Sequence, residues 1–196
     1  MFYGRPYVPH FRDIQRKFTE EIDNVFIVQT TDLGDYSSPY GFLHPRKKEK
    51  IGDRARLSVL KHSYGYPIID SGPKVEDIEY TMKNNQLELI ITYYTPSVGT
   101  GLVLKDFSCP TTDYHLETTP LEEYCTAFQI VFEDGNRTEI EPIIVDFNKI
   151  QLVKSFQDED LQSNIFTVDF GNCGWPKAIL YNSIGLPAVS FSLPLL

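Results

Sequence analysis

Three side chains suited to acid–base chemistry lie in one polar loop of the sequence. Asp32 and Asp35 follow the apolar run 25–30 (VFIVQT), and His44 closes the loop immediately before Pro45. An imidazole exchanges a proton near neutral pH, so His44 is a candidate general base. Its type and position alone leave a second interpretation open, in which His44 only caps the following helix or forms hydrogen bonds within the loop.

The elements that would position this loop are a buried strand and a helix. The run 25–30 is continuously apolar and rich in β-branched residues, which favours a strand buried on both faces of a parallel sheet. Pro45 at the first position and Gly65 beyond the last predict a helix over 45–63. Sites in open α/β sheets form at the carboxyl ends of strands. The partial positive charge of the helix N-terminus would keep His44 uncharged.

From Tyr66 onward the pattern changes to short strands. Residues 78–83 alternate, Asn84-Asn85 suits a tight turn, and residues 86–93 place apolar side chains on one face, which together predict a hairpin. Further strand-like runs, broken by Gly, Pro and Asp or Asn, predict an antiparallel sandwich. These runs are 127–132, 141–147, 149–153, 177–181 and 188–193.

The predicted fold class is therefore α/β plus β, in two parts. Residues 1–65, with a helix over 11–23, resemble the last strand–helix unit of a doubly wound sheet, and residues 66–196 form the β-rich part. A parallel strand needs neighbouring strands to satisfy its backbone hydrogen bonds, and one helix, one strand and one helix cannot supply them. We therefore expect the rest of that sheet to lie outside this sequence.

Composition restricts the partners and cofactors. A net charge of −9 argues against nucleic acid as a partner, because phosphate binding needs a dominant basic surface. Neither a membrane span nor a signal peptide is recognised. Cys109, Cys125 and Cys173 lack C-x-x-C spacing, and the other histidines are scattered, so we expect no metal; no cofactor is predicted either. For the cysteines, both reduced thiols and one disulfide plus a spare cysteine remain open. Asn136 begins an N-x-T sequon in a polar turn.

Residues 30–65, TTDLGDYSSPYGFLHPRKKEKIGDRARLSVLKHSYG, resemble the sialate O-acetylesterase family of the SGNH/GDSL hydrolases. In that family a D-x-G-D-like segment, an S-P-F/Y-G loop and an H-P-R-x-K block precede the final helix of the catalytic sheet. YGYPIIDSGP (64–73) and NCGWPKAILYNSIGLPAVSF (172–191) are also similar to the family. The resemblance is to the C-terminal portion of a longer protein.

The resemblance implies ester hydrolysis by a Ser-His-Asp mechanism, in which His44 takes a proton from the serine and an aspartate orients His44. Asp32 is the preferred aspartate because it lies nearest the predicted strand end, and Asp35 is the other candidate. Many bacterial relatives carry Asp two residues before the histidine, where this chain has Phe42. The G-D-S-like block that supplies the serine is absent, and neither Ser37 nor Ser38 is interpreted as a nucleophile.

The function that this resemblance implies is removal of O-acetyl groups from sialic acids or glycoconjugates. The chain would supply the histidine and aspartate, the missing N-terminal catalytic segment would be its partner, and the chain alone is expected to be inactive. A full-length form would be lysosomal or extracellular. The alternative is a non-catalytic β-sandwich module that binds carbohydrate or protein, without nucleic acid or membrane contact.

Overall fold

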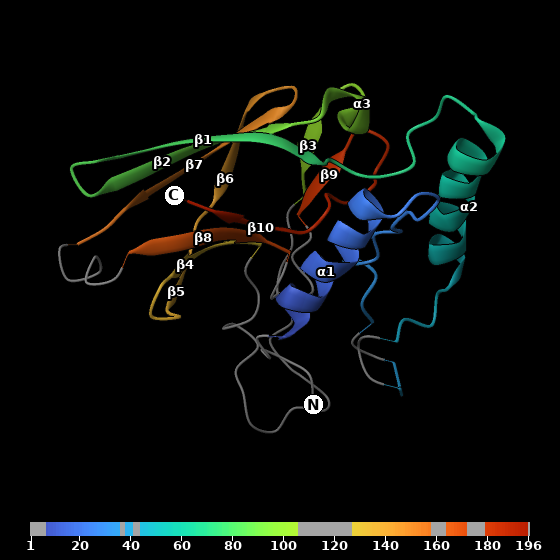
Figure 1. Ribbon diagram of the computed structural model, residues 1–196, viewed down its shortest axis with the longest axis horizontal. Helices are drawn as coiled ribbons and strands as arrows, with labels where there is room; N and C mark the ends of the chain where they lie inside the picture. The colour runs from blue at the N-terminus through green and yellow to red at the C-terminus, as the bar shows by residue number, and fades with distance from the viewer. Residues whose placement is uncertain are drawn as a thin grey trace.

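The computed structural model describes residues 7–35, 38–40, 44–105, 127–157, 164–171 and 179–195. Within these ranges the chain forms two four-stranded sheets, one two-stranded sheet and three helices (Figure 1). The helices are α1 (Tyr7–Glu21), α2 (Glu49–Tyr64) and α3 (Thr95–Val98). The strands are β1 (Val75–Lys83), β2 (Gln86–Tyr93), β3 (Leu102–Leu104), β4 (Phe128–Phe132), β5 (Arg137–Glu139), β6 (Pro142–Asp146), β7 (Lys149–Ser155), β8 (Ile165–Phe170), β9 (Leu180–Asn182) and β10 (Phe191–Pro194).

A two-residue asparagine turn sets the register of the first sheet. Asn84 and Asn85 adopt positive φ angles of 50° and 57°, and Lys83 pairs with Gln86 across the turn. Such a turn matches the natural twist of two antiparallel strands, and asparagine tolerates it better than most residues. The predicted hairpin is therefore confirmed. Strand β2 also pairs with β7, and β7 with β6, so the sheet order is β1-β2-β7-β6.

The second sheet has the order β10-β8-β4-β5, and the third pairs β3 with β9. Every strand pair is antiparallel in these sheets of the described chain. All five residues of β4 are buried, as expected for an interior strand that is covered on both faces. The predicted runs 127–132, 141–147 and 149–153 coincide with β4, β6 and β7. The run 188–193 overlaps β10 only over 191–193, and the end of 177–181 lies in β9.

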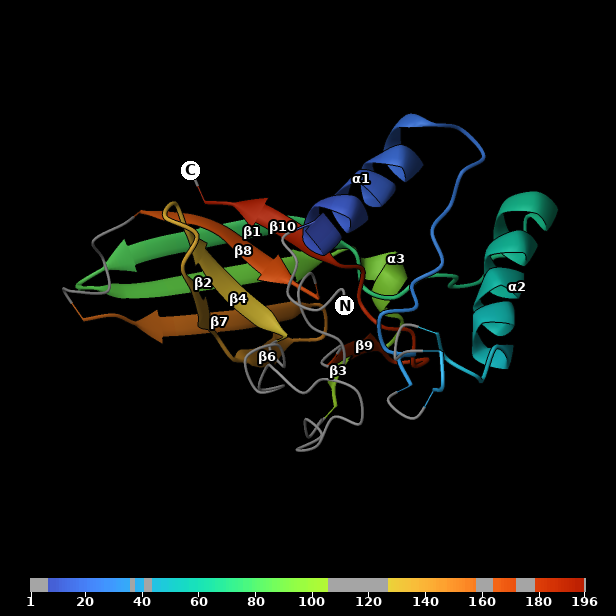
Figure 2. The ribbon, with the colours of Figure 1, turned by 90° about the horizontal axis from the view of Figure 1, so that it is seen from below.

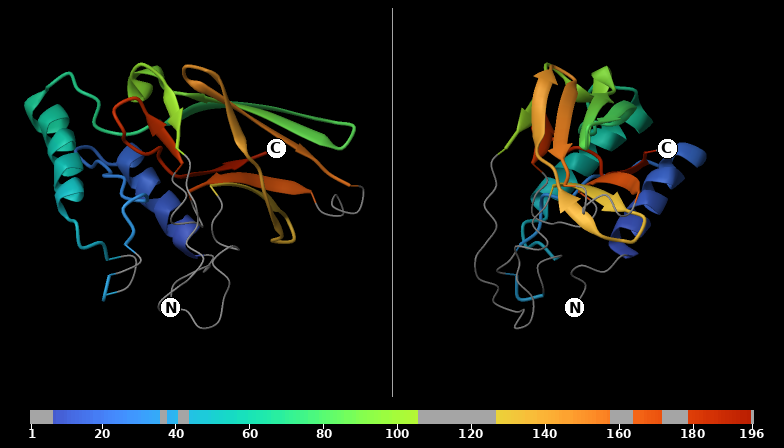
Figure 3. Two further views of the ribbon diagram at one scale, coloured as in Figure 1. Left: turned by 180° about the vertical axis from the view of Figure 1, so that it is seen from behind. Right: turned by 90° about the vertical axis from the view of Figure 1, so that its left-hand side faces the viewer.

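The two four-stranded sheets face each other across one apolar core (Figures 2 and 3). Leu89 and Ile150 of the first sheet and Phe128, Val168 and Phe170 of the second are at most 1% exposed. Burial of one such side chain stabilises the folded state by about 1.5–3 kcal/mol. This shared core is therefore the main source of stability in the β-rich part, and it draws on strands far apart in the sequence.

Helix α1 turns its polar side toward the sheets and its apolar side outward. It lies beside β10, and the Arg12 guanidinium donates a hydrogen bond to the Gly171 carbonyl. The opposite side carries apolar residues three or four positions apart, all at least 36% exposed: Phe11 (60%), Ile14 (36%), Phe18 (52%) and, just after the helix, Ile22 (45%). We call these four residues the apolar face of α1. An exposed stripe of this kind marks a surface for further contacts.

The predicted strand over 25–30 is wrong for this chain. The segment has no strand structure, and no sheet of the described residues includes it. Its side chains instead contact the segment that leads into β10: Gln29 Nε2 donates to Ser190 Oγ at 3.0 Å and to the Ala188 carbonyl at 3.4 Å. A parallel strand requires a neighbour to accept and donate its backbone hydrogen bonds. Among the described residues none is placed to do so.

Helix α2 ends where the sequence predicts and starts later. It begins at Glu49, with Lys48 as its N-cap, so the prediction that Pro45 occupies the first helical position is wrong. At the other end Gly65 has a φ of 71°, and its N–H and that of Tyr66 donate to the carbonyls of Lys61 and Leu60. This left-handed cap suits glycine, which has no Cβ to strain the backbone.

No helix among the described residues is long and apolar enough to cross a membrane. The division of the chain at 65/66 stays a prediction. The two parts contact each other closely, however, because Lys61 Nζ and His62 Nε2 lie 2.6 Å and 2.9 Å from the two carboxylate oxygens of Asp70.

Candidate active site

Asp32 is locked to α2 by an arginine. Arg54 Nη1 and Nη2 lie 2.6 Å and 2.7 Å from the two Asp32 carboxylate oxygens, and Nη1 also donates to the Gln29 carbonyl at 2.7 Å. The two side chains are only 11% and 10% exposed. A planar guanidinium that meets a carboxylate with two parallel hydrogen bonds gives a strong and directional contact. This pair fixes the start of the loop against α2.

Tyr181 extends this contact to the third sheet. Its hydroxyl lies 3.4 Å from Asp32 Oδ2, and Lys105 Nζ lies 3.5 Å from the centre of its ring. Burial and the nearby Asp32 carboxylate raise the pKa of the Tyr181 hydroxyl, so the phenol stays protonated and remains a hydrogen-bond donor. The loop of residues 31–44 is thus anchored to α2 and to β9.

Asp35 has a different arginine and a more open environment. Arg46 Nε and Nη2 lie 2.7 Å and 3.1 Å from its carboxylate oxygens, and the Arg46 backbone N–H donates to it at 3.3 Å. The hydrogen bond with Asp35 raises the pKa of Arg46. The Arg46 side chain is 54% exposed and that of Asp35 is 18% exposed. The pair closes the loop from Asp35 to Arg46 at its base.

His44 lies at the end of this loop and is exposed. Its carbonyl accepts a hydrogen bond of 2.7 Å from Ser38 Oγ, and Ser38 is fully buried. Ser38 therefore shapes the loop. Among the described residues, no hydrogen bond joins the His44 ring to Asp32 or Asp35, whose carboxylates face arginines. The N-terminus of α2 begins five residues after His44, so the helix is not the immediate neighbour that the sequence suggested.

Asp32, Asp35 and His44 thus come from one loop, and both aspartates lie near the N-terminal half of α2. It does not assemble the three into a hydrogen-bonded triad. Their catalytic roles stay a prediction. Ser37 and Phe42 lie outside the described residues, as do Cys109, Cys125 and Cys173. The described part of the chain contains no cluster of three or more ligands that could hold a metal ion.

A histidine–aspartate contact that the sequence analysis missed occurs at the other end of α2. His62 bonds to the buried carboxylate of Asp70, and the ring of Phe26 stacks on His62 with centroids 5.0 Å apart. Burial alone would raise the pKa of Asp70, but hydrogen bonds and charges from Lys61 and His62 outweigh it and lower that pKa below its ordinary value. The lysine and histidine in the last turn of a helix also complement its dipole. This contact joins α2 to the β-rich part.

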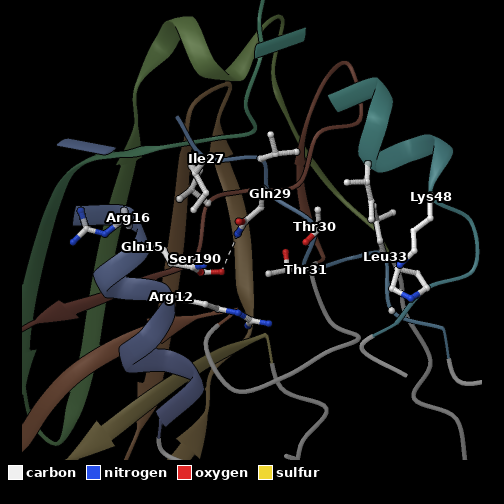
Figure 4. Close-up of a pocket in the computed structure, with 15 residues that line it drawn as sticks. Arg12, Gln15, Arg16, Ile27, Gln29, Thr30, Thr31, Leu33, Lys48 and Ser190 are labelled. Carbon is white, nitrogen blue, oxygen red and sulfur yellow. Dashed lines mark hydrogen bonds between the residues drawn. The ribbon is translucent and has the colours of Figure 1, made fainter. Parts of the chain in front are cut away.

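A groove and a cavity lie on opposite sides of the loop. An open groove of about 700 Å³ contains both aspartates and Arg46, Lys47 and Lys50. A more enclosed cavity of about 290 Å³ lies between α1, the segment 27–34, the start of α2 and Ser190 (Figure 4). Leu33, Gly34 and Pro45 line both, so the loop is the wall that separates them.

Comparison with known proteins finds relatives of this chain. No protein-family model matches the sequence. The curated sialate O-acetylesterases of Pongo abelii and Homo sapiens are each 35% identical to it over 75 residues, and that of Rattus norvegicus is 33% identical over 70 residues. The chain resembles the sialate O-acetylesterases. The resemblance stated from the sequence is therefore confirmed.

The matches cover 38% of this chain and 14% of the sialate O-acetylesterases of Pongo abelii and Homo sapiens, so the chain spans a small part of those proteins. The fold has a solved counterpart in a carbohydrate acetylesterase from Xanthomonas citri, with a TM-score of 0.54 and 17% identity. That likeness covers 84% of this chain and 31% of the other. At 17% identity this likeness supports a mostly antiparallel fold with few helices, and it does not show that the two proteins share a reaction.

Proposed function

We propose that this chain is the histidine-bearing part of an acetyl ester hydrolase of the sialate O-acetylesterase type. Its substrate would be an O-acetylated sialic acid or a glycoconjugate that carries one. The observation that carries the proposal is the 35% identity to two curated sialate O-acetylesterases over 75 residues. The loop with Asp32, Asp35 and His44 supports it, because one loop carries an exposed histidine and two aspartates.

In the proposed reaction a serine outside this sequence attacks the acetyl carbonyl. His44 takes the serine proton and gives it to the sugar oxygen as the ester C–O bond breaks, which leaves an acetyl-serine. His44 then takes a proton from water, which attacks the acetyl-serine, releases acetate and restores the serine. A carboxylate holds the imidazole in the productive orientation. Asp32 is the aspartate that the sequence favours. Asp35 would exchange its arginine for His44 at a smaller cost, because Arg46 is 54% exposed whereas Arg54 is 10% exposed. The proposal therefore includes a conformational step in which one aspartate turns from its arginine toward His44.

The segment that carries the serine would dock on the apolar face of α1 and beside residues 25–30. The apolar face is exposed and residues 25–30 have no strand partner in the described chain. A neighbouring parallel strand would satisfy the backbone of 25–30 and cover both surfaces. Only in the longer protein, with that neighbour present, would residues 1–65 form the last strand–helix unit of an SGNH-type doubly wound sheet, followed by a sandwich-like β part. A full-length form of this kind would be lysosomal or extracellular.

Acetate release from an O-acetylated sialic acid tests the proposal. The 196-residue chain is compared with a form extended by the serine-bearing segment of its own gene, each with and without His44→Ala. We expect no turnover by the chain alone and a loss of about 10³-fold or more in kcat on His44→Ala in the extended form. His62→Ala is the matched control, because its aspartate contact lies at the far end of α2. Full activity of the extended His44→Ala form would contradict the proposal.

A second candidate function is carbohydrate or protein binding without catalysis. It is favoured by one observation: the cluster of buried core residues runs from Leu87 to Phe191 and includes none of the described residues before 66. A stable fragment from about residue 66 onward after limited proteolysis would show that the β-rich part folds by itself. Binding of a glycan by that fragment, with no dependence of acetate release on His44, would establish this second function.

A further inference from the structure

Strand β1 is the longest edge strand of the described sheets. It spans Val75–Lys83, and among the described strands its only neighbour is β2 (Figure 2). From Asp77 to Lys83 its register with β2 is uninterrupted. A long regular edge presents backbone N–H and C=O groups that can pair with another chain, and proteins usually interrupt such edges with proline or a bulge, or cover them.

The other edge strands of the two four-stranded sheets are short or interrupted. Strand β6 begins with Pro142, and its register with β7 shifts between Ile144 and Asp146. Strand β5 has three residues, and β10 has four, ends with Pro194 and contacts α1. Strand β1 has an early bulge, but the regular stretch that follows contains no proline. It is therefore the edge best suited to accept another strand.

The asparagine turn decides which backbone groups of β1 point outward. Lys83 and Gln86 flank this two-residue turn, so they form a hydrogen-bonded pair, and alternate residues back along β1 also bond to β2. Ile78 and Met82 are among the intervening residues, so their N–H and C=O groups point away from β2. Among the described residues, no backbone group of another segment bonds to Ile78 or Met82.

The charges of β1 are complementary to those of a second, antiparallel copy. With Tyr80 on a two-fold axis, Asp77 of each copy stands directly opposite Lys83 of the other. Opposite charges placed across two strands stabilise the pairing, and like charges destabilise it. An axis at Glu79 would place two carboxylates opposite each other, and an axis at Thr81 would leave Asp77 without a basic partner. The charges therefore favour the axis at Tyr80.

The same register brings exposed apolar side chains together. Ile78 and Met82 pair across β1 and β2 with Ile91 and Leu87, which are at most 1% exposed, so both lie on the core face of the sheet. Met82 itself is 44% exposed. In the second copy Ile78 stands opposite Met82, and their outward N–H and C=O groups can exchange hydrogen bonds. Pairing would thus cover apolar surface and satisfy the backbone at once.

A groove lies where the hairpin tip of the second copy would end. It has a volume of about 410 Å³ and lies between α1, the start of β1 and β10, with residues 75–78 in its wall. In the register above, the Asn84-Asn85 turn of the second copy extends past residue 77 into this groove. Arg16 and Lys74 line the groove together with acidic residues of β1, so it supplies space rather than one sign of charge.

We propose that two copies of this chain associate through β1, antiparallel and with Tyr80 at the two-fold axis, and that the hairpin tip of each copy fills the groove of the other. The first sheets of the two copies then form one continuous sheet. The net charge of −9 on each copy opposes association, so the dimer is weak and reversible. Neither the loop of His44 nor the apolar face of α1 takes part, so the dimer is independent of the proposed function.

Sedimentation velocity of the 196-residue chain over a concentration series, in reducing buffer, measures the association. The variants are Asp77→Lys, Lys83→Asp, the double variant that exchanges the two charges, and Met82→Pro. Proline is tolerated on an edge strand where the N–H points outward, so Met82→Pro blocks pairing and leaves the bonds to β2. Glu139→Lys is the matched control, because it makes the same charge change at an exposed residue of edge strand β5. Thermal unfolding of each variant confirms that it is folded.

We expect the dissociation constant of the dimer to rise about tenfold on either single charge change, because symmetry makes each change alter two contacts. The double variant should recover the affinity, Met82→Pro should be monomeric, and the control should associate as the unmodified chain does. The amides of Ile78 and Met82 should exchange with solvent more slowly at high protein concentration, whereas those of Glu79 and Thr81 should be protected at every concentration.

A chain that stays monomeric throughout the series would overturn the proposal. A dimer that persists in Met82→Pro would also overturn it, because that dimer would use another surface, such as the apolar face of α1. Weakening by both single charge changes without recovery in the double variant would overturn the register with Tyr80 at the axis.

Discussion

The ion pair between Asp32 and Arg54 should be the contact on which the candidate loop depends most. We predict that Arg54→Gln destabilises the chain by about 3–5 kcal/mol, the range for leaving one charge of a buried pair without its partner. We expect a loss of stability in the upper part of this range, because the Arg54 and Asp32 side chains are only 10% and 11% exposed and both carboxylate oxygens of Asp32 are hydrogen-bonded to Arg54. The lost hydrogen bond to the Gln29 carbonyl adds about 1 kcal/mol.

The second arginine–aspartate pair of the same loop provides the control. Arg46→Gln removes a contact of similar geometry to Asp35, but the Arg46 side chain is 54% exposed. Water replaces the lost partner of an exposed charge, so we expect little change in stability. The double variant Asp32→Asn with Arg54→Gln should regain part of the stability lost in Arg54→Gln, because it leaves no uncompensated charge.

Urea unfolding followed by far-UV circular dichroism at neutral pH measures these differences. Limited proteolysis reports in parallel whether the loop of residues 31–44 is released before the β-rich part unfolds. Equal destabilisation by Arg54→Gln and Arg46→Gln would contradict this prediction, and so would a double variant that is less stable than Arg54→Gln. Either result would mean that water reaches Asp32 as freely as it reaches Asp35.

Three further substitutions test the fold around the site. Gly72→Ala should lower the melting temperature strongly, because the added Cβ would lie 1.9 Å from the Pro187 carbonyl oxygen. Gly52→Ala should raise the melting temperature, because Gly52 lies in a helix with open space around it and alanine favours the helix more than glycine does. Tyr93→Phe should be neutral or stabilise by about 1 kcal/mol in urea unfolding. The Tyr93 hydroxyl is fully buried, which raises its pKa well above the ordinary value, and it has no hydrogen-bond partner among the described residues. Asp70 has a lower pKa folded than unfolded, so its contribution to stability is complete above about pH 4 and is lost as the pH falls through the folded pKa. A pH series should therefore show a shallower acid limb for Asp70→Asn; an unchanged limb would contradict this linkage.

Local patterns predicted the elements whose signals are short in range. Asn84-Asn85 specified a turn, the alternation over 86–93 specified the buried face of β2, and Gly65 specified the end of α2. Each of these signals depends on backbone conformation or side-chain period over a few residues. The loop that holds the candidate site was also located correctly between residues 25–30 and α2.

Strand β8 shows where local reasoning failed. It lies between β4 and β10, yet its sequence places Asp169 in the strand, which argues against a buried strand. Asp169 is only 5% exposed and is satisfied by Thr167 at 2.9 Å, Ser192 at 2.6 Å and Arg137 at 3.3 Å. Two of those partners come from other strands. A single sequence gives no sign that such distant residues would meet.

The sequence by itself determined the strand-rich class of the chain, its tight turns and the order in which the aspartates, the histidine and α2 follow one another. Tertiary structure alone decided which charges meet: Asp32 with Arg54, Asp35 with Arg46, and His62 with Asp70. It also decided that residues 25–30 form no strand and that α1 faces outward with its apolar side. The physical reason is the distance along the chain over which each interaction acts. Turns and periodicity act between neighbours in the chain, whereas ion pairs, sheet ladders and burial depend on what lies nearby in space.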